Sequence, residues 1–261
     1  MQLPVQEDSP SQLRCDILVF VVTSSEIDAL KAASKDLNLQ FQRRPGKAFT
    51  YYNLGKVGDS RVMAVRTSMG PFSYGGSAAM AIHAKAETSA TALISLGMAF
   101  GVDRKTQPIG TLLVSRMLLP YDNREVKTVE GRMIVDYSDV AAHNAKPALT
   151  QMLQREAERA EWHGKVSFGA VLTGGAKIRC SAYRNELVSN LSNFGEMVVG
   201  GEMEGAGMLA TSDPRDPVWV LVKGISDYAD EGRDNEVEKG RELACRNAAL
   251  FVLKAISNAN L

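Results

Sequence analysis

The 261-residue sequence lacks the features that mark several common classes of protein. Its three cysteines, Cys15, Cys180 and Cys245, lie far apart and show no CxxC or Cys/His spacing, so we expect neither a disulfide framework nor a zinc site. We expect a cytoplasmic protein, since no membrane span or signal peptide is apparent, and we interpret the cysteines as reduced structural thiols because disulfides are rare in the cytosol. No apolar run reaches the roughly 18 to 20 residues of a membrane span, and the first residues contain no apolar core of a signal peptide. We therefore expect no membrane association.

Net charge and several sequence motifs are also missing. Thirty basic residues balance thirty acidic ones, which removes the broad positive field of a dedicated nucleic-acid binder. There is no P-loop, GxGxxG, HExxH or GxSxG sequence, and the three histidines belong to no motif. We therefore expect no nucleic-acid partner, no metal, no cofactor and no histidine-based catalytic triad.

The pattern of apolar residues predicts a single α/β domain. Residues 1–15 are polar and contain two prolines, so we expect a loose arm before a domain at residues 16–261. Strand-like runs, several of them continuously apolar as in buried strands, occur at residues 16–22, 61–67, 91–96, 110–116, 167–173, 197–199 and 218–224. Helical patterns occur between them at residues 26–37, 75–89, 139–161, 182–193, 202–211 and 236–258. This alternation predicts a three-layer α/β/α fold with a mostly parallel or mixed central sheet.

Acidic residues follow three of the predicted strands. Glu26 follows the first strand, Glu202 and Glu204 follow the sixth within GGEMEGAG, and Asp227 follows the last within KGISDYAD. Each acid on its own could be a helix-dipole charge, an N-cap or a turn residue. Because the carboxyl ends of strands in open α/β sheets carry the chemistry, the three positions together favour a catalytic site.

These segments resemble the signatures of the methylthioadenosine/S-adenosylhomocysteine nucleosidases, which are members of the nucleoside phosphorylase superfamily. EMEGAG and VKGISDYAD resemble the paired acidic signatures of that family, LISLGMAFGV its Gly-rich turn, and GGAKI its purine-binding loop. The resemblance extends from Asp16 to the C-terminus. It implies a nucleoside phosphorylase-like fold and hydrolysis of the N-glycosidic bond of an adenine nucleoside.

The resemblance also implies a role for each acid. Asp227 would protonate purine N7, and Glu204 would bind the ribose hydroxyls with Met203 packed under the sugar. Glu26 would act as the general base on water. The remaining substrate-binding residues that we predict are Thr23, Met98, Lys177, Ile178, Glu202 and Ser226, with the backbone of Ile178 at the adenine edge and Ser226 beside Asp227.

The sequence departs from the family where the 5′ substituent binds. Lys177 replaces a stacking aromatic residue, Thr23 replaces an apolar residue, and Val237 stands where an aromatic lid residue is usual. The 5′ pocket is therefore less apolar than in the family. Both a thioether nucleoside and a 5′-phosphorylated adenine nucleotide stay open as substrates.

Two further alternatives stay open. One is a phosphorylase, although Ser95 and Met98 replace the Arg and Ser with which hexameric purine phosphorylases bind phosphate. The other is a weakly catalytic nucleotide-binding or sensing module, against which the three acids argue, because a binder does not need them. We expect a small-molecule substrate and a homodimer, since the family forms dimers or larger assemblies and residues 75–89 contain many small side chains.

Overall fold

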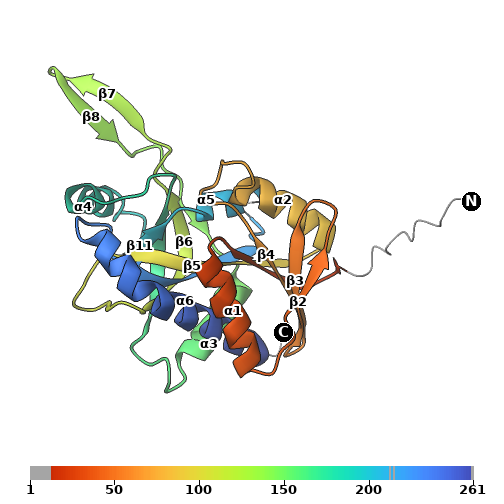
Figure 1. Cartoon of the computed structure of the whole chain (residues 1–261). Coiled ribbons are helices and arrows are strands. Elements are labelled where there is room, and N and C mark those ends of the chain that lie inside the picture. Colours follow the sequence, from red (N-terminus) through yellow and green to blue (C-terminus); the bar gives the residue numbers. More distant parts are fainter. Residues whose placement is uncertain (1–12, 212, 214, 260–261) are drawn as a thin grey trace, which may run out of the picture.

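The chain folds as one α/β unit around a mixed sheet. The computed structural model describes residues 13–211, 213 and 215–259. A ten-stranded sheet lies between two layers of helices (Figure 1), which confirms the predicted fold class. Most of the arm expected at residues 1–15 lies outside the described residues. Cys15, within them, is already buried, and its N–H donates to Thr88 O.

The centre of the sheet consists of buried parallel strands. β1 (Ile17–Val21) pairs in parallel with both β4 (Ser60–Arg66) and β5 (Ala92–Gly101), and β5 pairs in parallel with β12 (Trp219–Asp227). All residues of β1 and β12 are buried, because helices cover both faces and only continuous apolar runs tolerate that environment. The carboxyl ends of β1, β5 and β12 consequently meet at one edge of the sheet.

The other strands extend the sheet on both sides of this centre. The strand order is β11-β10-β6-β12-β5-β1-β4-β3-β2. The additional strands are β2 (Gln42–Pro45), β3 (Thr50–Val57), β6 (Leu112–Pro120), β9 (His143–Asn144), β10 (Val166–Thr173) and β11 (Val198–Glu202).

One end of the sheet curls back onto β5. β11 pairs antiparallel with β5 through Gly200 opposite Gly101 and Gly201 opposite Phe100. A Cβ atom on Gly200 would overlap the Phe100 carbonyl oxygen, and one on Gly201 would overlap the Phe100 ring. The two glycines therefore allow the close approach that brings the end of β11 next to the ends of β5 and β12.

Helices cover the two faces of the sheet. α1 (Ser24–Asp36), α3 (Pro147–Ala157) and α6 (Arg233–Ser257) lie below the sheet as it is drawn in Figure 1. α2 (Ser77–Thr88) and the short α5 (Gly205–Met208) lie above it and pack together with the 3₁₀ turn η2 (Leu209–Thr211), and α4 (Ser181–Asn190) lies near β11. Among the described residues we find no helix with the length and apolar character that a membrane crossing requires.

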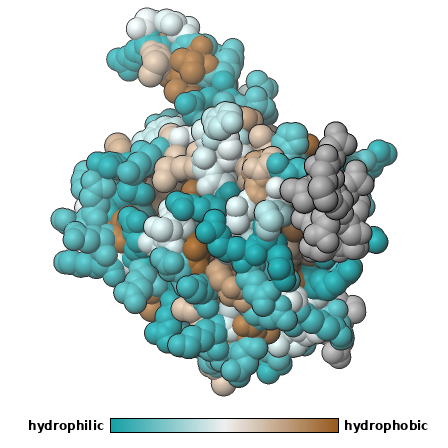
Figure 2. Space-filling model, turned by 45° about the vertical axis from the view of Figure 1, so that its right-hand side comes forward, coloured by the Kyte–Doolittle hydropathy of each residue, from teal (hydrophilic) through white to brown (hydrophobic). Residues whose placement is uncertain are grey.

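A two-stranded hairpin projects from the body of the molecule. β7 (Glu125–Val129) and β8 (Arg132–Asp136) pair only with each other and extend away from the sheet (Figure 1). Apolar side chains gather on this hairpin (Figure 2), where Val126 is 59% and Met133 73% exposed. The sequence analysis did not identify this hairpin, nor β2, β3 and β9.

Two predicted helices are wrong in part. The helix expected at residues 139–161 is restricted to Pro147–Ala157, because His143 and Asn144 pair with β6 as β9 and a residue before proline disfavours helical geometry. The helix expected at 202–211 is also wrong at its start. Glu202 is the last residue of β11, and only Gly205–Met208 forms an α-helix, since glycine is a poor helix former.

Candidate active site

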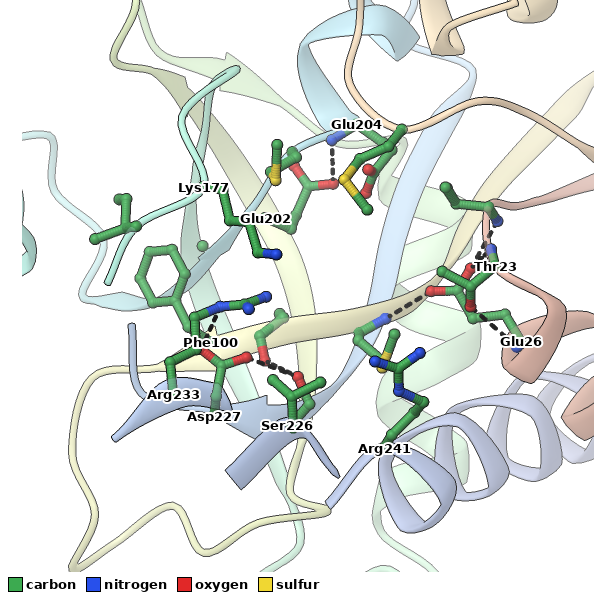
Figure 3. A pocket seen from close by; sticks show the side chains of 18 of the residues that line it. Thr23, Glu26, Phe100, Lys177, Glu202, Glu204, Ser226, Asp227, Arg233 and Arg241 are labelled. Atoms are coloured by element: carbon green, nitrogen blue, oxygen red, sulfur yellow. Dashed lines mark hydrogen bonds and ion pairs between the residues drawn. The ribbon is translucent and has the colours of Figure 1, made fainter. Parts of the chain in front are cut away.

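A cavity lies where β1, β5, β11 and β12 end. Its volume is about 160 Å³. Figure 3 shows side chains from these strand ends and from α6 directed toward it. All ten site residues expected from the sequence line this cavity: Thr23, Glu26, Met98, Lys177, Ile178, Glu202, Met203, Glu204, Ser226 and Asp227.

Glu26 is held in the first turn of α1 by backbone N–H groups. Its Oε2 accepts from Val22 N at 2.6 Å and from Thr23 N at 2.9 Å, and its Oε1 accepts from Met98 N at 3.2 Å. Thr23 caps the helix, because its hydroxyl oxygen accepts from Glu26 N in a capping box. Burial raises the pKa of Glu26, and the backbone donors and Lys223 oppose this effect only in part. A carboxylate with a raised pKa in a fixed position suits a general base.

Glu204 forms an ion pair inside the protein. Its Oε2 lies 3.3 Å from Nζ of Lys223, which projects from the middle of β12 and is 1% exposed. Burial alone would lower the pKa of Lys223, but the negative charges of Glu204, Glu202 and Glu26 outweigh it, so the pKa is raised. Lys223 therefore supplies the positive charge that balances a cluster of buried carboxylates.

Glu202 organises the backbone around Glu204. Its Oε2 accepts from Glu204 N at 2.9 Å, its Oε1 accepts from Gly205 N at 2.9 Å, and Lys223 lies 3.5 Å away. Burial raises the pKa of Glu202, while Lys223 opposes the shift. These contacts occupy most of its acceptor capacity, so Glu202 positions Glu204 and the start of α5.

Asp227 lies on the opposite side of the cavity from Glu26 (Figure 3). Ser226 Oγ donates to its Oδ2 and Ala229 N to its Oδ1, both at 2.9 Å, and Arg233 Nε lies 3.4 Å from Oδ1. Burial is the largest influence and raises the pKa of Asp227 despite these donors. A raised pKa favours the protonated carboxyl group that could donate a proton to a bound ligand.

The end of the cavity near Asp227 has an aromatic wall. The Phe100 ring lies beside Asp227 and below Lys177, whose side chain points into the cavity (Figure 3). Ile178 is buried, whereas Lys177 is exposed. A flat base could bind here between Phe100 and the loop of Lys177 and Ile178, with its edge facing Asp227.

The sequence analysis missed four charged or aromatic groups of the site: Phe100, Lys223, Arg233 and Arg241. Phe100 belongs to the Gly-rich segment LISLGMAFGV. An aromatic residue at the end of a strand could have been recognised there as a site residue. Arg233 and Arg241 are eight residues apart on α6, with Val237 midway, a spacing that directs all three toward one side of a helix. Lys223 follows four apolar residues in β12. A charged residue inside a buried strand could have been recognised as a site residue.

The site contains carboxylates but no arrangement suited to a metal. Among residues 13–211, 213 and 215–259, no group of three or more His, Cys, Asp or Glu side chains is placed to hold a metal ion. The acids of the cavity bind backbone N–H groups, a lysine, a serine or an arginine instead.

Known structures share this fold. The nucleosidase for 5′-methylthioadenosine and S-adenosylhomocysteine from Neisseria meningitidis is 19% identical with a TM-score of 0.74, covering 93% of this chain and 99% of that one. The S-adenosylhomocysteine nucleosidase of Streptococcus pyogenes is 19% identical, with a TM-score of 0.76 and coverage of 96% and 100%. Futalosine hydrolase of Helicobacter pylori is 17% identical, with a TM-score of 0.72 and coverage of 92% and 96%.

Sequence comparison adds the family. No match is found among curated proteins. The family model described as the phosphorylase superfamily matches residues 16–257, almost all of the region in which the sheet and the cavity lie. The chain belongs to the phosphorylase superfamily.

Proposed function

We propose that this protein hydrolyses the N-glycosidic bond of an adenine nucleoside, or of a 5′-phosphorylated adenine nucleotide, and releases free adenine. One observation carries the proposal: Glu26, Glu204 and Asp227 come from three separate strand ends and line one small cavity. Cleavage of this bond passes through a cation-like sugar and expels the base as an anion. A site for it needs an acid at the base, a negative charge at the sugar and a base for water.

Asp227 is placed to be the acid. Its raised pKa keeps a proton available, and the adjacent Phe100 ring offers a surface for the purine. Proton transfer from Asp227 to purine N7 turns the departing base into a neutral molecule as the bond between C1′ and N9 breaks.

Glu204 and Glu26 are placed to act on the sugar and on water. An ionised Glu204, balanced by Lys223, accepts hydrogen bonds from the ribose hydroxyls and stabilises positive charge that grows on the ring. Glu26 accepts a proton from the water whose oxygen bonds to C1′. Products are free adenine and the sugar; Asp227 then regains a proton from solvent, and Glu26 releases to solvent the proton that it took from water.

The environment of Glu26 favours water over phosphate as the nucleophile. Val22 N, Thr23 N and Met98 N converge on one point, which is the kind of donor cluster that binds an anion. The Glu26 carboxylate already fills this cluster. A phosphate ion next to it would meet a buried negative charge, so phosphorolysis is disfavoured.

We also propose a cytoplasmic homodimer that does not bind nucleic acid. The cytoplasmic location is supported by three free cysteines, two of them buried. The dimer is supported by apolar side chains on the segment from Ser68 to Gly76, where Phe72 is 81% exposed, and on α2, where Ile82 is 49% exposed. The balanced net charge argues against a nucleic-acid partner.

A direct assay tests the proposed reaction. Purified protein is incubated with methylthioadenosine, S-adenosylhomocysteine, adenosine, AMP or ATP, each with and without inorganic phosphate, and free adenine is measured by chromatography beside the Glu26→Gln variant. We expect adenine release without phosphate that falls about 10²- to 10⁴-fold in the variant. Release only with phosphate would indicate a phosphorylase. Binding without any release would indicate a binding module.

A further inference from the structure

A second, larger depression adjoins the open end of the catalytic cavity. Its volume is about 1420 Å³, and the two spaces share Val22, Thr23, Met69 and Arg241 as lining residues. Ligand pockets usually measure about 300 to 1000 Å³, so the catalytic cavity of about 160 Å³ is too small to enclose more than part of a nucleotide. Any large substituent must extend into the second depression.

The positions of the acids determine which part of the ligand reaches this depression. Under the proposed function, the base contacts Asp227, and the ribose lies between Glu204 and Glu26. Thr23 and Arg241 then flank the end of the cavity opposite Asp227 (Figure 3). Because the 5′ carbon is attached to C4′, across the ring oxygen from the C1′ that carries the base, its substituent can extend toward these two residues.

The depression has a positive lining without any carboxylate. Arg66, Arg241 and His83 line it, together with hydroxyl groups, and no Asp or Glu does. Arg66 Nε donates to Val22 O at 2.7 Å, which fixes the guanidinium group beside the end of β1 and leaves its two terminal nitrogens available. The guanidinium group of Arg241, on α6, has no hydrogen bond or ion pair within the part of the chain that the structure describes. Two guanidinium groups without acidic partners suit a dianion.

Hydroxyl groups in the depression are compatible with the same kind of ligand. Thr67 lines the depression and is 5% exposed, yet its Oγ1 has no hydrogen-bond partner among the described residues. Buried hydroxyl groups are normally paired, and a bound ion is one of the partners that account for an exception. Ser24, the first residue of α1, lines the same space and adds another hydroxyl group to it.

We propose that this depression binds a phosphate group, and that the group is the 5′-phosphate of the nucleotide whose base and ribose occupy the catalytic cavity. This inference rests on the proposed function for the orientation of the ligand. It names the substrate class as purine 5′-nucleotides rather than thioether nucleosides. Free inorganic phosphate presents the same chemistry and is the alternative source that an experiment must separate.

Binding to a protein that does not turn over tests the inference independently of catalysis. Affinities for AMP and for adenosine are measured by calorimetry in the Glu26→Gln background, alone and with Arg66→Gln, Arg241→Gln or Arg155→Gln. Arg155 is an exposed arginine of α3 outside both cavities and serves as the matched control. We expect AMP to bind at least about tenfold more tightly than adenosine, and this ratio to fall about tenfold to hundredfold in the first two variants only. Equal affinities in the parent, or an unchanged ratio in both variants, would overturn the inference.

Thr67→Val adds a readout that separates binding from folding. Because the Thr67 hydroxyl has no partner within the described residues, its removal should leave the urea midpoint unchanged or higher while it weakens AMP binding several-fold. A lower midpoint with unchanged AMP affinity would contradict a role in ligand binding.

The source of the phosphate is decided with the wild-type protein. Adenine release from adenosine is followed with and without inorganic phosphate, beside release from AMP. Independence from phosphate, with faster release from AMP, supports the 5′-phosphate. Stimulation by phosphate that disappears in Arg66→Gln would overturn that assignment in favour of free phosphate. Preferential binding of AMP without any release would refute the proposed hydrolysis while supporting the phosphate subsite.

Discussion

Nζ of Lys223 lies 3.3 Å from Oε2 of Glu204 in the interior of the protein, and the lysine side chain is 1% exposed. Glu202 lies 3.5 Å from the same nitrogen. Desolvation of these charges is costly, and their mutual attraction offsets the cost only while the charges remain matched. The pair therefore links the stability of the fold to the charge of the site.

Replacing Lys223 with methionine should destabilise the protein and reduce its activity. The variant leaves two carboxylates buried without a cation, and breaking a buried pair in this way costs about 3 to 5 kcal/mol. Urea unfolding at neutral pH measures the loss. The double variant Lys223→Met/Glu204→Gln should recover part of that free energy, because it removes one of the uncompensated charges. A double variant less stable than Lys223→Met alone would contradict the pairing.

Much of the site could be predicted because its acidic residues closely follow apolar runs that are recognisable as strands. Residues 16–22 and 218–224 are recognisable as buried strands, and strand ends in an α/β sheet meet at one edge, so Glu26 and Asp227 could be placed together. The basic residues of the site were harder to predict. In the sequence, Lys223 is only a single charge within an apolar run. Its ion-pair partners become apparent only from the three-dimensional pairing of β12 with β5 and β6.

The local sequence pattern did not predict the strands whose structure depends on glycine residues or on a short turn. Gly200 and Gly201 suggest a loop in the sequence, yet they extend β11 because a strand without side chains can approach Phe100. The hairpin of β7 and β8 could have been predicted from the residues of its turn. Glu130 and Gly131 have φ values of 49° and 75°, the positive pair that a tight two-residue hairpin turn requires, and Gly at the second position is typical of it.

Activity should depend on pH through two carboxyl groups that must be in opposite protonation states. Asp227 must be protonated and Glu26 ionised, and burial raises the pKa of both above the ordinary carboxyl range. Activity should therefore fall as pH rises through the pKa of Asp227 and fall as pH drops through the pKa of Glu26. The profile of kcat/KM against pH checks this. A profile whose alkaline limb persists unchanged in Asp227→Asn, measured on its residual activity, would assign that limb to another group.

The same shift gives Asp227 a defined effect on stability. Its pKa in the folded protein exceeds the unfolded value of about 4, so between these two values the folded state binds more protons and stability declines as pH rises. The variant Asp227→Asn cannot titrate. Its unfolding free energy relative to wild type should therefore increase from pH 4 upward, as measured by urea unfolding at several pH values. A difference that decreases with pH would mean that the folded pKa of Asp227 is lowered.

Gly97→Ala should impair catalysis by displacing Glu26. A Cβ atom at position 97 would overlap Oε1 of Glu26 and lie 2.8 Å from its Cδ, so the carboxylate would lose its contact with Met98 N. We expect kcat to fall toward that of Glu26→Gln, with about 1 to 3 kcal/mol of lost stability from overpacking. Because both changes act on one carboxylate, adding Gly97→Ala to Glu26→Gln should cost little further activity. Full additivity of the two effects on kcat would show that Gly97 acts independently of Glu26.

The exposed apolar segment before α2 should be required for the proposed homodimer. Phe72 and Tyr74 lie on the loop between β4 and α2, Phe72 with 81% of its surface exposed, and Met69 beside them is 52% exposed. All three residues also line the second depression, so a partner subunit bound here would border that depression. Aspartate at positions 72 and 74 would place two charges in an apolar contact, where desolvation without a partner is unfavourable. Sedimentation velocity should then show a dimer for the wild type and a monomer for Phe72→Asp/Tyr74→Asp. The matched control is Val129→Asp/Met133→Asp on the hairpin, where the two side chains are 48% and 73% exposed, and this protein should remain dimeric. A monomer from the hairpin variant and a dimer from the loop variant would place the interface on the hairpin instead.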